Sequence, residues 1–140
     1  EIICDMEQGI GLSAVQVGVP WKLFLVRLDS ESKFKPTGRY GYFVNCEYNT
    51  MDAEGKIASL EGCLSLRSPD GRTRMFQVPR YKNVKIEGFQ LTDRNGLKLE
   101  DISVELVLPN DKEAIVFQHE IDHHRGVLIS DNDNKELFLW

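Results

Sequence analysis

The sequence predicts an α+β fold in which antiparallel strands wrap around one central, metal-binding helix. Residues 83–91 and 97–108 alternate apolar and polar side chains, as half-buried strands do. The Asn-Gly pair at 95–96 lies just before the second segment and is a strong hairpin signal. Nearer the C-terminus, an apolar stretch at 114–117 leads into all three histidines of the chain, within residues 119–124. Helical spacing there would place two imidazole rings one turn apart on one face.

Further elements are expected before the hairpin. Residues 1–8 are predicted to be the end of a helix, because Ile2, Ile3 and Met6 share a face and Gly9 stops it. Residues 21–28 and 40–48 are rich in apolar and aromatic side chains and are predicted to be strands. We also expect a short strand at 56–60 and an edge strand at 74–79.

The histidine-bearing helix is expected to begin beside Asn110. The Asn110 side chain can cap the free N–H groups there, and Glu113, three residues later, completes a capping-box-like pair. Gly126 is placed to end the helix. We expect a short strand at 127–129, an acidic turn at 131–134 and an apolar end at 137–140.

Composition and charge restrict the class of protein. A chain of 140 residues suits one domain over residues 1–140, and Glu1 falls inside a predicted helix, so we expect a missing segment to precede it. The net charge of −5 argues against nucleic-acid binding, and no apolar run is long enough for a membrane span. Three widely spaced cysteines favour a reducing compartment, with Cys4 and Cys46 as buried apolar residues.

The segment at 118–123 (QHEIDH) carries the clearest chemical signal. On a helix, His119 and His123 share a face and can bind one metal ion. Glu120 lies about 100° around the helix, from where its carboxylate can take a proton from a bound water. Hydrolytic metal sites usually have three protein ligands, so the pattern alone leaves the third ligand open. A plain surface helix is the alternative, but the preceding apolar residues favour a buried site. His124 falls off the ligand face, and we expect it to be solvated or hydrogen-bonded.

Two earlier segments with glycines are candidate parts of the same site. Gly9 and Gly11 allow the backbone to lie close to a ligand, but the segment lacks the third glycine of a dinucleotide-binding loop. Gln16 is the one polar side chain in the apolar stretch after Ser13, and its amide could bond either backbone or a substrate carbonyl. Gly62, just before Cys63, again suggests tight backbone geometry.

Together, three segments resemble the peptide deformylase family. They are GIGLSAVQ at 9–16, EGCLS at 61–65 and QHEIDH at 118–123, which follow the family's G-x-G-L-A-A-x-Q, E-G-C-L-S and Q-H-E-x-D-H in order. The resemblance covers nearly the whole chain. It implies a peptide deformylase-like fold and a hydrolase that removes the N-terminal formyl group from N-formylmethionyl nascent peptides, releasing formate.

The resemblance also supplies the third ligand. Cys63 would hold the metal with His119 and His123, and Glu120 would act first as base and then as acid. One thiolate and two imidazoles suit Fe(II), Zn(II), Ni(II) or Co(II), and the family likeness favours Fe(II).

The remaining roles surround this metal. The formyl oxygen would meet the backbone N–H of Leu64 and the side-chain amide of Gln16. Glu61 and Asp122 are expected to orient the ligating residues through hydrogen bonds, although a plain surface or salt-bridge role is an almost equal alternative for Asp122. The residues expected to bind substrate are Gly9, Ile10, Gly11, Leu64 and Val116. Ordinary core packing is an equal alternative for the three that would form the methionine pocket, Ile10, Leu64 and Val116.

The same resemblance bears on partners and location. We expect contact with N-formylmethionyl nascent chains and a transient ribosome contact, but no direct nucleic-acid or membrane binding. The expected location is the cytoplasm, or an organelle stroma or matrix in a eukaryote. Two other interpretations remain. The chain could be a zincin-type peptidase with Glu136 as third ligand and Cys63 incidental, or a binding protein that retains the fold without turnover.

Overall fold

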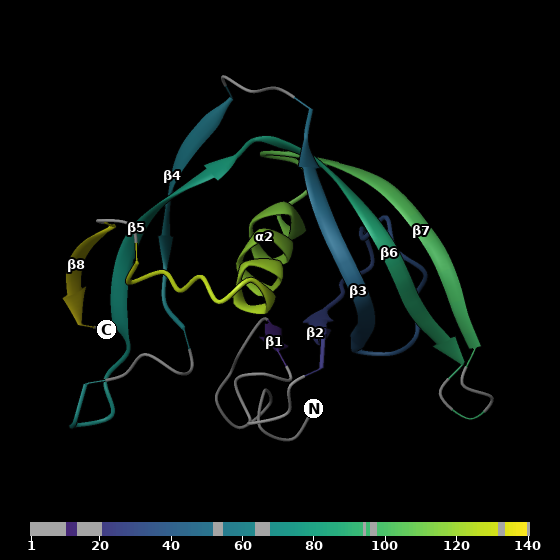
Figure 1. Cartoon of the computed structure of the whole chain (residues 1–140), viewed down its shortest axis with the longest axis horizontal. Helices are drawn as coiled ribbons and strands as arrows, with labels where there is room; N and C mark the ends of the chain where they lie inside the picture. The colour runs from purple at the N-terminus through teal and green to yellow at the C-terminus, as the bar shows by residue number, and fades with distance from the viewer. Residues whose placement is uncertain are drawn as a thin grey trace.

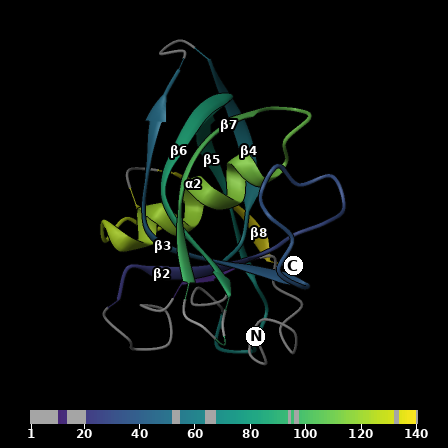
Figure 2. The ribbon, with the colours of Figure 1, turned by 90° about the vertical axis from the view of Figure 1, so that its right-hand side faces the viewer.

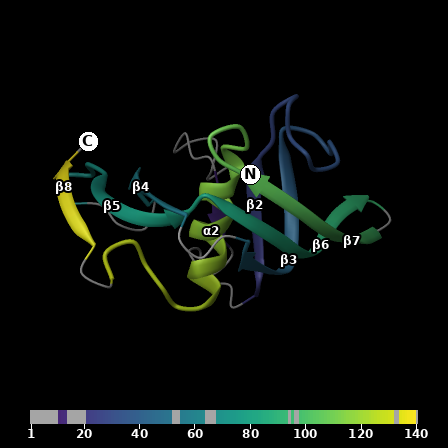
Figure 3. The same cartoon turned by 90° about the horizontal axis from the view of Figure 1, so that it is seen from above.

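The fold consists of strands on two sides of one helix, α2 (Glu113–His124). The computed structural model describes residues 11–13, 21–51, 55–63, 68–93, 95, 98–131 and 134–139. Over these residues the strands form two antiparallel sheets, and α2 lies between them (Figures 1 and 3). The predicted α+β fold with strands wrapped around a central helix is therefore confirmed. The helix predicted at 1–8, with Cys4, lies outside the described residues.

The larger sheet has the strand order β1-β2-β3-β6-β7 among the described residues. Figure 2 faces this sheet, with α2 behind β6 and β7. Four of its strands overlap the segments predicted at 21–28, 40–48, 83–91 and 97–108, and β6 and β7 form the hairpin expected around the Asn-Gly pair. Their bounds are β1 (Gly11–Ser13), β2 (Leu23–Arg27), β3 (Tyr40–Thr50), β6 (Asn83–Asp93) and β7 (Lys98–Val107).

The smaller sheet has the order β4-β5-β8, with β4 at Lys56–Glu61, β5 at Arg74–Tyr81 and β8 at Lys135–Leu139. The prediction of an edge strand at 74–79 is wrong, because β8 pairs with β5 from Arg74 to Gln77. Pro79 lies beyond that pairing, where β5 borders only β4 among the described residues, and a missing N–H is tolerated there. The apolar C-terminal end is thus a sheet strand.

A single residue, Lys82, separates β5 from β6, so the chain passes directly from one sheet into the other (Figure 1). This crossing passes the middle of α2, where the side chain of Gln118 bonds both the N–H and the carbonyl of Tyr81. Side chains from both sheets can therefore reach the helix from opposite sides.

One face of α2 packs on the larger sheet through Phe117. Its ring lies between 4.7 and 5.4 Å, centroid to centroid, from the rings of Phe24, Phe34 and Phe43. Aromatic packing of this kind buries a large apolar area and fixes the helix orientation. Because successive helix residues are 100° apart, His119, Asp122 and His123 then face away from this core. The other buried residues of the cluster are Val26, Cys46, Val84, Ile86, Leu106, Ala114 and Ile121.

The two ends of α2 differ from the prediction in one respect. The residue before the helix is Lys112, without a side-chain cap bond, so the predicted cap at Asn110 is wrong. Asp111 instead closes a turn before the helix, because its carboxylate accepts the N–H of Val107. At the other end Gly126 has φ +76 and donates to the carbonyl of His123, which confirms the predicted helix stop.

The strand predicted at 127–129 is also wrong. The N–H of Val127 donates to the carbonyl of Asp122 as part of the helix stop, and the N–H of Leu128 donates to the side chain of Asp131. These bonds curl the segment into turns. Within the described part of the chain, no helix combines the length and apolar character needed to cross a membrane.

Candidate metal centre

Three candidate ligand atoms converge between α2 and the smaller sheet. One atom each of Cys63, His119 and His123 lies within 4.8 Å of the others. Cys63 follows β4 by two residues, is 4% exposed, and its Sγ is 3.4 Å from Nε2 of His123. A tetrahedral ion with ordinary metal–sulfur and metal–nitrogen bonds would separate two such ligand atoms by about 3.5 Å. The spacing therefore fits one transition-metal ion held by a thiolate and imidazoles.

His119 is oriented by a carboxylate behind it. Its Nδ1 lies 2.9 Å from Oε1 of Glu61, the last residue of β4. A bond at Nδ1 fixes the ring and leaves Nε2 as the nitrogen available to an ion. Glu61 therefore lies in a position from which it could orient His119, and that role stays a prediction.

Glu61 belongs to a buried network centred on Arg80. The guanidinium donates two hydrogen bonds of 2.7 Å to Glu61, through Nε and Nη2, and a third of 2.7 Å, through Nη1, to Asp122 Oδ2. Burial opposes ionisation of Glu61, but the bonds from Arg80 and His119 outweigh it and lower the pKa of this carboxyl to about 2. The carboxylate facing His119 therefore stays ionised. Asp122 also makes the salt bridge that was its alternative role.

Glu120 points into a different environment. It is 3% exposed, and its Oε2 has no hydrogen-bond partner among the described residues. Burial raises the pKa of this carboxyl to about 7, against the opposing charges of His119 and His123. An added Cβ on Gly11 would lie 3.2 Å from Glu120 Oε1, so the backbone of β1 closely approaches the carboxylate. A buried, unpaired carboxylate oxygen beside three ligand atoms is suited to accepting a proton from water.

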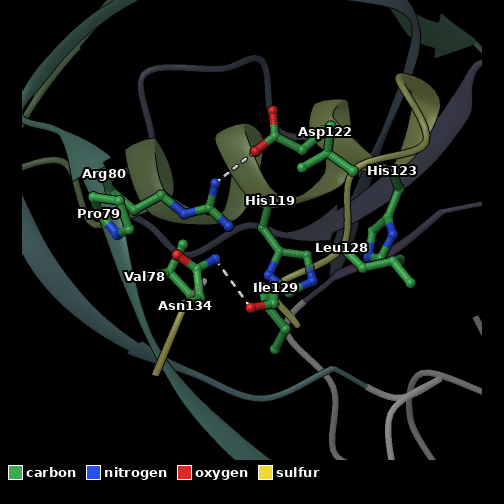
Figure 4. A pocket seen from close by; sticks show the side chains of 10 residues that line it. Val78, Pro79, Arg80, His119, Asp122, His123, Leu128, Ile129 and Asn134 are labelled. Atoms are coloured by element: carbon green, nitrogen blue, oxygen red, sulfur yellow. Dashed lines mark hydrogen bonds and ion pairs between the residues drawn. The ribbon is translucent and has the colours of Figure 1, made fainter. Parts of the chain in front are cut away.

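A cavity adjoins the two histidines on the side of β5 (Figure 4). Arg80 and Asp122 border it, and Asn134 donates to the carbonyl of Ile129 across it. Its other lining residues are apolar: Val78, Pro79, Val127, Leu128 and Ile129. Val116, the one residue of the expected methionine pocket that the structure describes, does not line this cavity.

Comparison with known proteins decides the family. The model of the polypeptide deformylase family matches residues 1–137. The chain belongs to the peptide deformylase family. Peptide deformylases are hydrolases that remove the formyl group from N-formylmethionyl nascent peptides.

Individual peptide deformylases match most of the chain. That of Heliobacterium modesticaldum is 33% identical over 132 residues, covering 92% of this chain and 72% of the relative. That of Thermodesulfovibrio yellowstonii is 36% identical over 133 residues, covering 93% and 69%. The Met-Ala-Ser-bound class I type b enzyme of Acinetobacter baumannii superposes with a TM-score of 0.64 at 27% identity, covering 91% and 72%. The chain spans 64 and 65% of two other curated peptide deformylases.

Several of the predicted site residues lie outside the described residues, namely Gly9, Ile10, Gln16 and Leu64. Their roles stay predictions. Val116 is half-buried and packs at the edge of the main core beside Gly11, which is compatible with either a pocket or a core role.

Three other expectations concern residues outside the group of candidate ligands. The ring of His124 packs 5.5 Å, centroid to centroid, from that of Phe24, and both ring nitrogens are buried, so the solvated alternative for this residue is wrong. Burial accordingly lowers the pKa of its imidazole. Glu136, the third ligand of the zincin alternative, pairs with Arg74 at an exposed edge. Cys46 is buried in the core, as expected.

Arg80 borders the candidate metal centre, and no role was predicted for it from the sequence. A lone arginine on a strand carries no chemical signal. Buried and exposed residues alternate along β5, however, and Arg80 continues the buried row of Phe76 and Val78. A charged residue in such a row needs buried partners of opposite charge, and this requirement could have identified Arg80 as part of the site.

Proposed function

We propose that this chain hydrolyses the formyl group of N-formylmethionyl nascent peptides with one divalent ion held by Cys63, His119 and His123. The convergence of their three ligand atoms within 4.8 Å carries the proposal. A thiolate with two imidazoles suits Fe(II), Zn(II), Ni(II) or Co(II) rather than Mg²⁺ or Ca²⁺, and Fe(II) is our choice for the ion in the cell. When bound, such an ion supplies Lewis acidity and lowers the pKa of a water molecule.

Glu120 carries the proton in this proposal. Its unpaired Oε2 accepts a proton from the attacking water and passes it to the amine as the carbon–nitrogen bond breaks, so that formate and a free amino terminus leave. A carboxyl whose pKa is about 7 can both accept and release a proton near neutral pH.

The substrate contacts follow from the motifs. We propose that the N–H of Leu64 and the amide of Gln16 stabilise the charge on the formyl oxygen. Gly9 and Gly11 would let the backbone lie beside the peptide, and Ile10, Leu64 and Val116 would surround the methionine side chain. The tripeptide in the Acinetobacter baumannii relative begins with methionine, which supports this substrate class.

Cellular context follows from the substrate. Nascent chains emerge at ribosomes, so we propose a transient ribosome contact and action in the cytoplasm, or in an organelle stroma or matrix.

The test is formate release from formyl-Met-Ala-Ser by the anaerobically purified chain loaded with Fe(II) or Ni(II). Parent turnover that disappears in Glu120→Ala, with metal content unchanged, would support the reaction and its base. Cys63→Ser should lose the metal, whereas a zincin using Glu136 would retain it. A parent that binds one metal per chain but releases no formate would overturn the proposed activity.

A further inference from the structure

A bulge in β3 sets the direction of the side chains that follow it. Val44 pairs with Phe89 and Glu47 with Glu87, so β3 has one extra residue between these pairs. Because side chains alternate along a strand, one extra residue exchanges the two faces. Asn45 takes φ 50, and Cys46 turns into the core, 1% exposed. Tyr48 then lies on the face of the sheet that looks toward α2.

The partner strand accommodates the bulge through a glycine. A Cβ added to Gly88 would lie 2.7 Å from Cα of Cys46, which is closer than real Cβ contacts come. Only glycine at this position leaves room for the extra residue on β3.

From the inner face, Tyr48 reaches the helix that carries the candidate ligands. Its hydroxyl donates a 2.8 Å hydrogen bond to Oδ1 of Asp122. The guanidinium of Arg125 lies over its ring, 4.6 Å from the centroid, and the ring of Tyr81 is 6.4 Å away. Burial, followed by the charge of Asp122, raises the pKa of Tyr48 to about 12, so the hydroxyl remains a donor.

The hydrogen bond to Asp122 begins a continuous series that ends at His119. Oδ1 of Asp122 accepts a hydrogen bond from the hydroxyl of Tyr48, while Oδ2 accepts one of 2.7 Å from Nη1 of Arg80. Arg80 donates two hydrogen bonds to the carboxylate of Glu61, and Oε1 of Glu61 is hydrogen-bonded to Nδ1 of His119. The side chain of Asp122 is 16% exposed, against 4% for Arg80, 6% for Glu61 and 11% for His119, so water reaches Asp122 more easily than the three residues that follow it in the series.

We propose that Tyr48 is a positioning residue of the metal centre. Its hydroxyl holds the Asp122 carboxylate in the orientation that fixes Arg80, and Arg80 through Glu61 fixes the ring of His119. This inference rests on the proposed metal site and adds a residue 71 positions away from His119 in the sequence. Without the hydroxyl, Asp122 turns toward water, the ring of His119 gains freedom and the ion dissociates faster.

The test uses the cobalt-loaded chain, because a cobalt–thiolate bond has its own absorption band. The measured quantity is the rate at which a chelator removes the ion, followed at that band. Direct hydrogen-bond partners of ligands typically change metal affinity 10–100-fold, so Tyr48→Phe, which acts through three intervening residues, should release cobalt about three- to tenfold faster. The phenyl ring in this variant would keep its packing against Arg125 and Tyr81.

Tyr81→Phe is the matched control. Tyr81 is the neighbouring half-buried ring, and its hydroxyl makes no hydrogen bond within the described residues, so this variant should release cobalt at the parent rate. Thermal unfolding of both metal-free variants reports any general loss of stability.

A second comparison uses Asp122→Asn, in which the series to Arg80 is already weakened. Tyr48→Phe should change the rate less than about twofold in that background, because non-additivity is expected of residues in one network.

The outcomes separate this inference from the proposed function. A parent without the cobalt–thiolate band would overturn the metal site and the inference with it. A parent with the band, but equal cobalt release from Tyr48→Phe and Tyr81→Phe, would overturn the inference alone. A full effect of Tyr48→Phe in the Asp122→Asn background would also overturn it, because the tyrosine would then act by another route.

Discussion

Oε1 of Glu61 lies 2.9 Å from Nδ1 of His119 and 2.7 Å from Nη2 of Arg80. One carboxylate oxygen therefore joins a candidate metal ligand to a buried cation. The side chains of Glu61 and Arg80 are only 6% and 4% exposed, so neither charge has water to replace its partner. Positioning of the imidazole and stability of the fold consequently depend on the same ion pair.

Glu61→Gln should affect both properties. Loss of a direct partner of a ligand should weaken cobalt affinity about 10–100-fold. Breaking a buried ion pair should lower the free energy of unfolding of the metal-free chain by about 3 kcal/mol, because Arg80 keeps only Asp122. Chelator competition and urea unfolding measure the two effects. Glu136→Gln, at an exposed pair with Arg74, is the control and should cost about 1 kcal/mol or less. Equal losses in both variants would contradict the structural assignment.

Glu120 should make the stability of the metal-free chain depend on pH. Its folded pKa, about 7, is raised above the ordinary 4.5, so the folded state holds the proton more tightly. The stability contributed by the neutral carboxyl is present below pH 4.5 and is lost as the pH rises through 7. The full shift corresponds to roughly 3 kcal/mol.

Glu120→Gln removes this titration. The variant and the parent should therefore diverge in free energy of unfolding between about pH 4.5 and 8, with the variant becoming relatively more stable. Urea unfolding at a series of pH values checks this, and a constant difference between the two proteins would refute it.

Gly11→Ala should separate catalysis from metal binding. The new methyl would lie 3.0 Å from Cγ1 of Val116 and 3.2 Å from Oε1 of Glu120, while none of its three nearest neighbours is a candidate metal ligand. Displacement of the carboxylate should lower kcat/KM for formyl-Met-Ala-Ser about 10–100-fold. Metal content should match that of the parent. Unchanged turnover would show that the backbone of β1 does not constrain Glu120.

Gly88→Ala should destabilise the bulge in β3. Its methyl meets Cα of Cys46 at 2.7 Å, and overpacking of this kind costs about 1–3 kcal/mol. Gly38→Ala is the matched control, since Gly38 also has a positive φ but a Cβ there meets nothing within 4 Å. Urea unfolding should show the larger loss for Gly88→Ala. That variant should also release cobalt faster, because the bulge directs Tyr48 toward Asp122.

The local pattern of the sequence was enough to predict most elements. Strand periodicity, the Asn-Gly hairpin and the glycine after α2 depend on residues close together in the chain, and these predictions are confirmed. The errors occur where a distant partner decides. β8 converts β5 from an expected edge into a central strand, and Asp111 rather than Asn110 organises the entry to α2. Local sequence alone could not predict that β8 pairs with β5 or that Asp111, rather than Asn110, forms the turn before α2.

The chemistry available at the site follows from local sequence, because His119, Glu120 and His123 need only a helix to share one region of its surface. The residues alone left the third ligand open, and the family resemblance supplied Cys63, which the fold brings to His123 across 60 positions. Arg80 and Tyr48 were decided only by tertiary structure. They meet Asp122 across 42 and 74 positions, and those contacts depend on strand register, the bulge in β3 and the burial of charges between two sheets. A local sequence pattern does not predict contacts between residues so far apart in the chain, because these contacts form only when the sheets pack around α2.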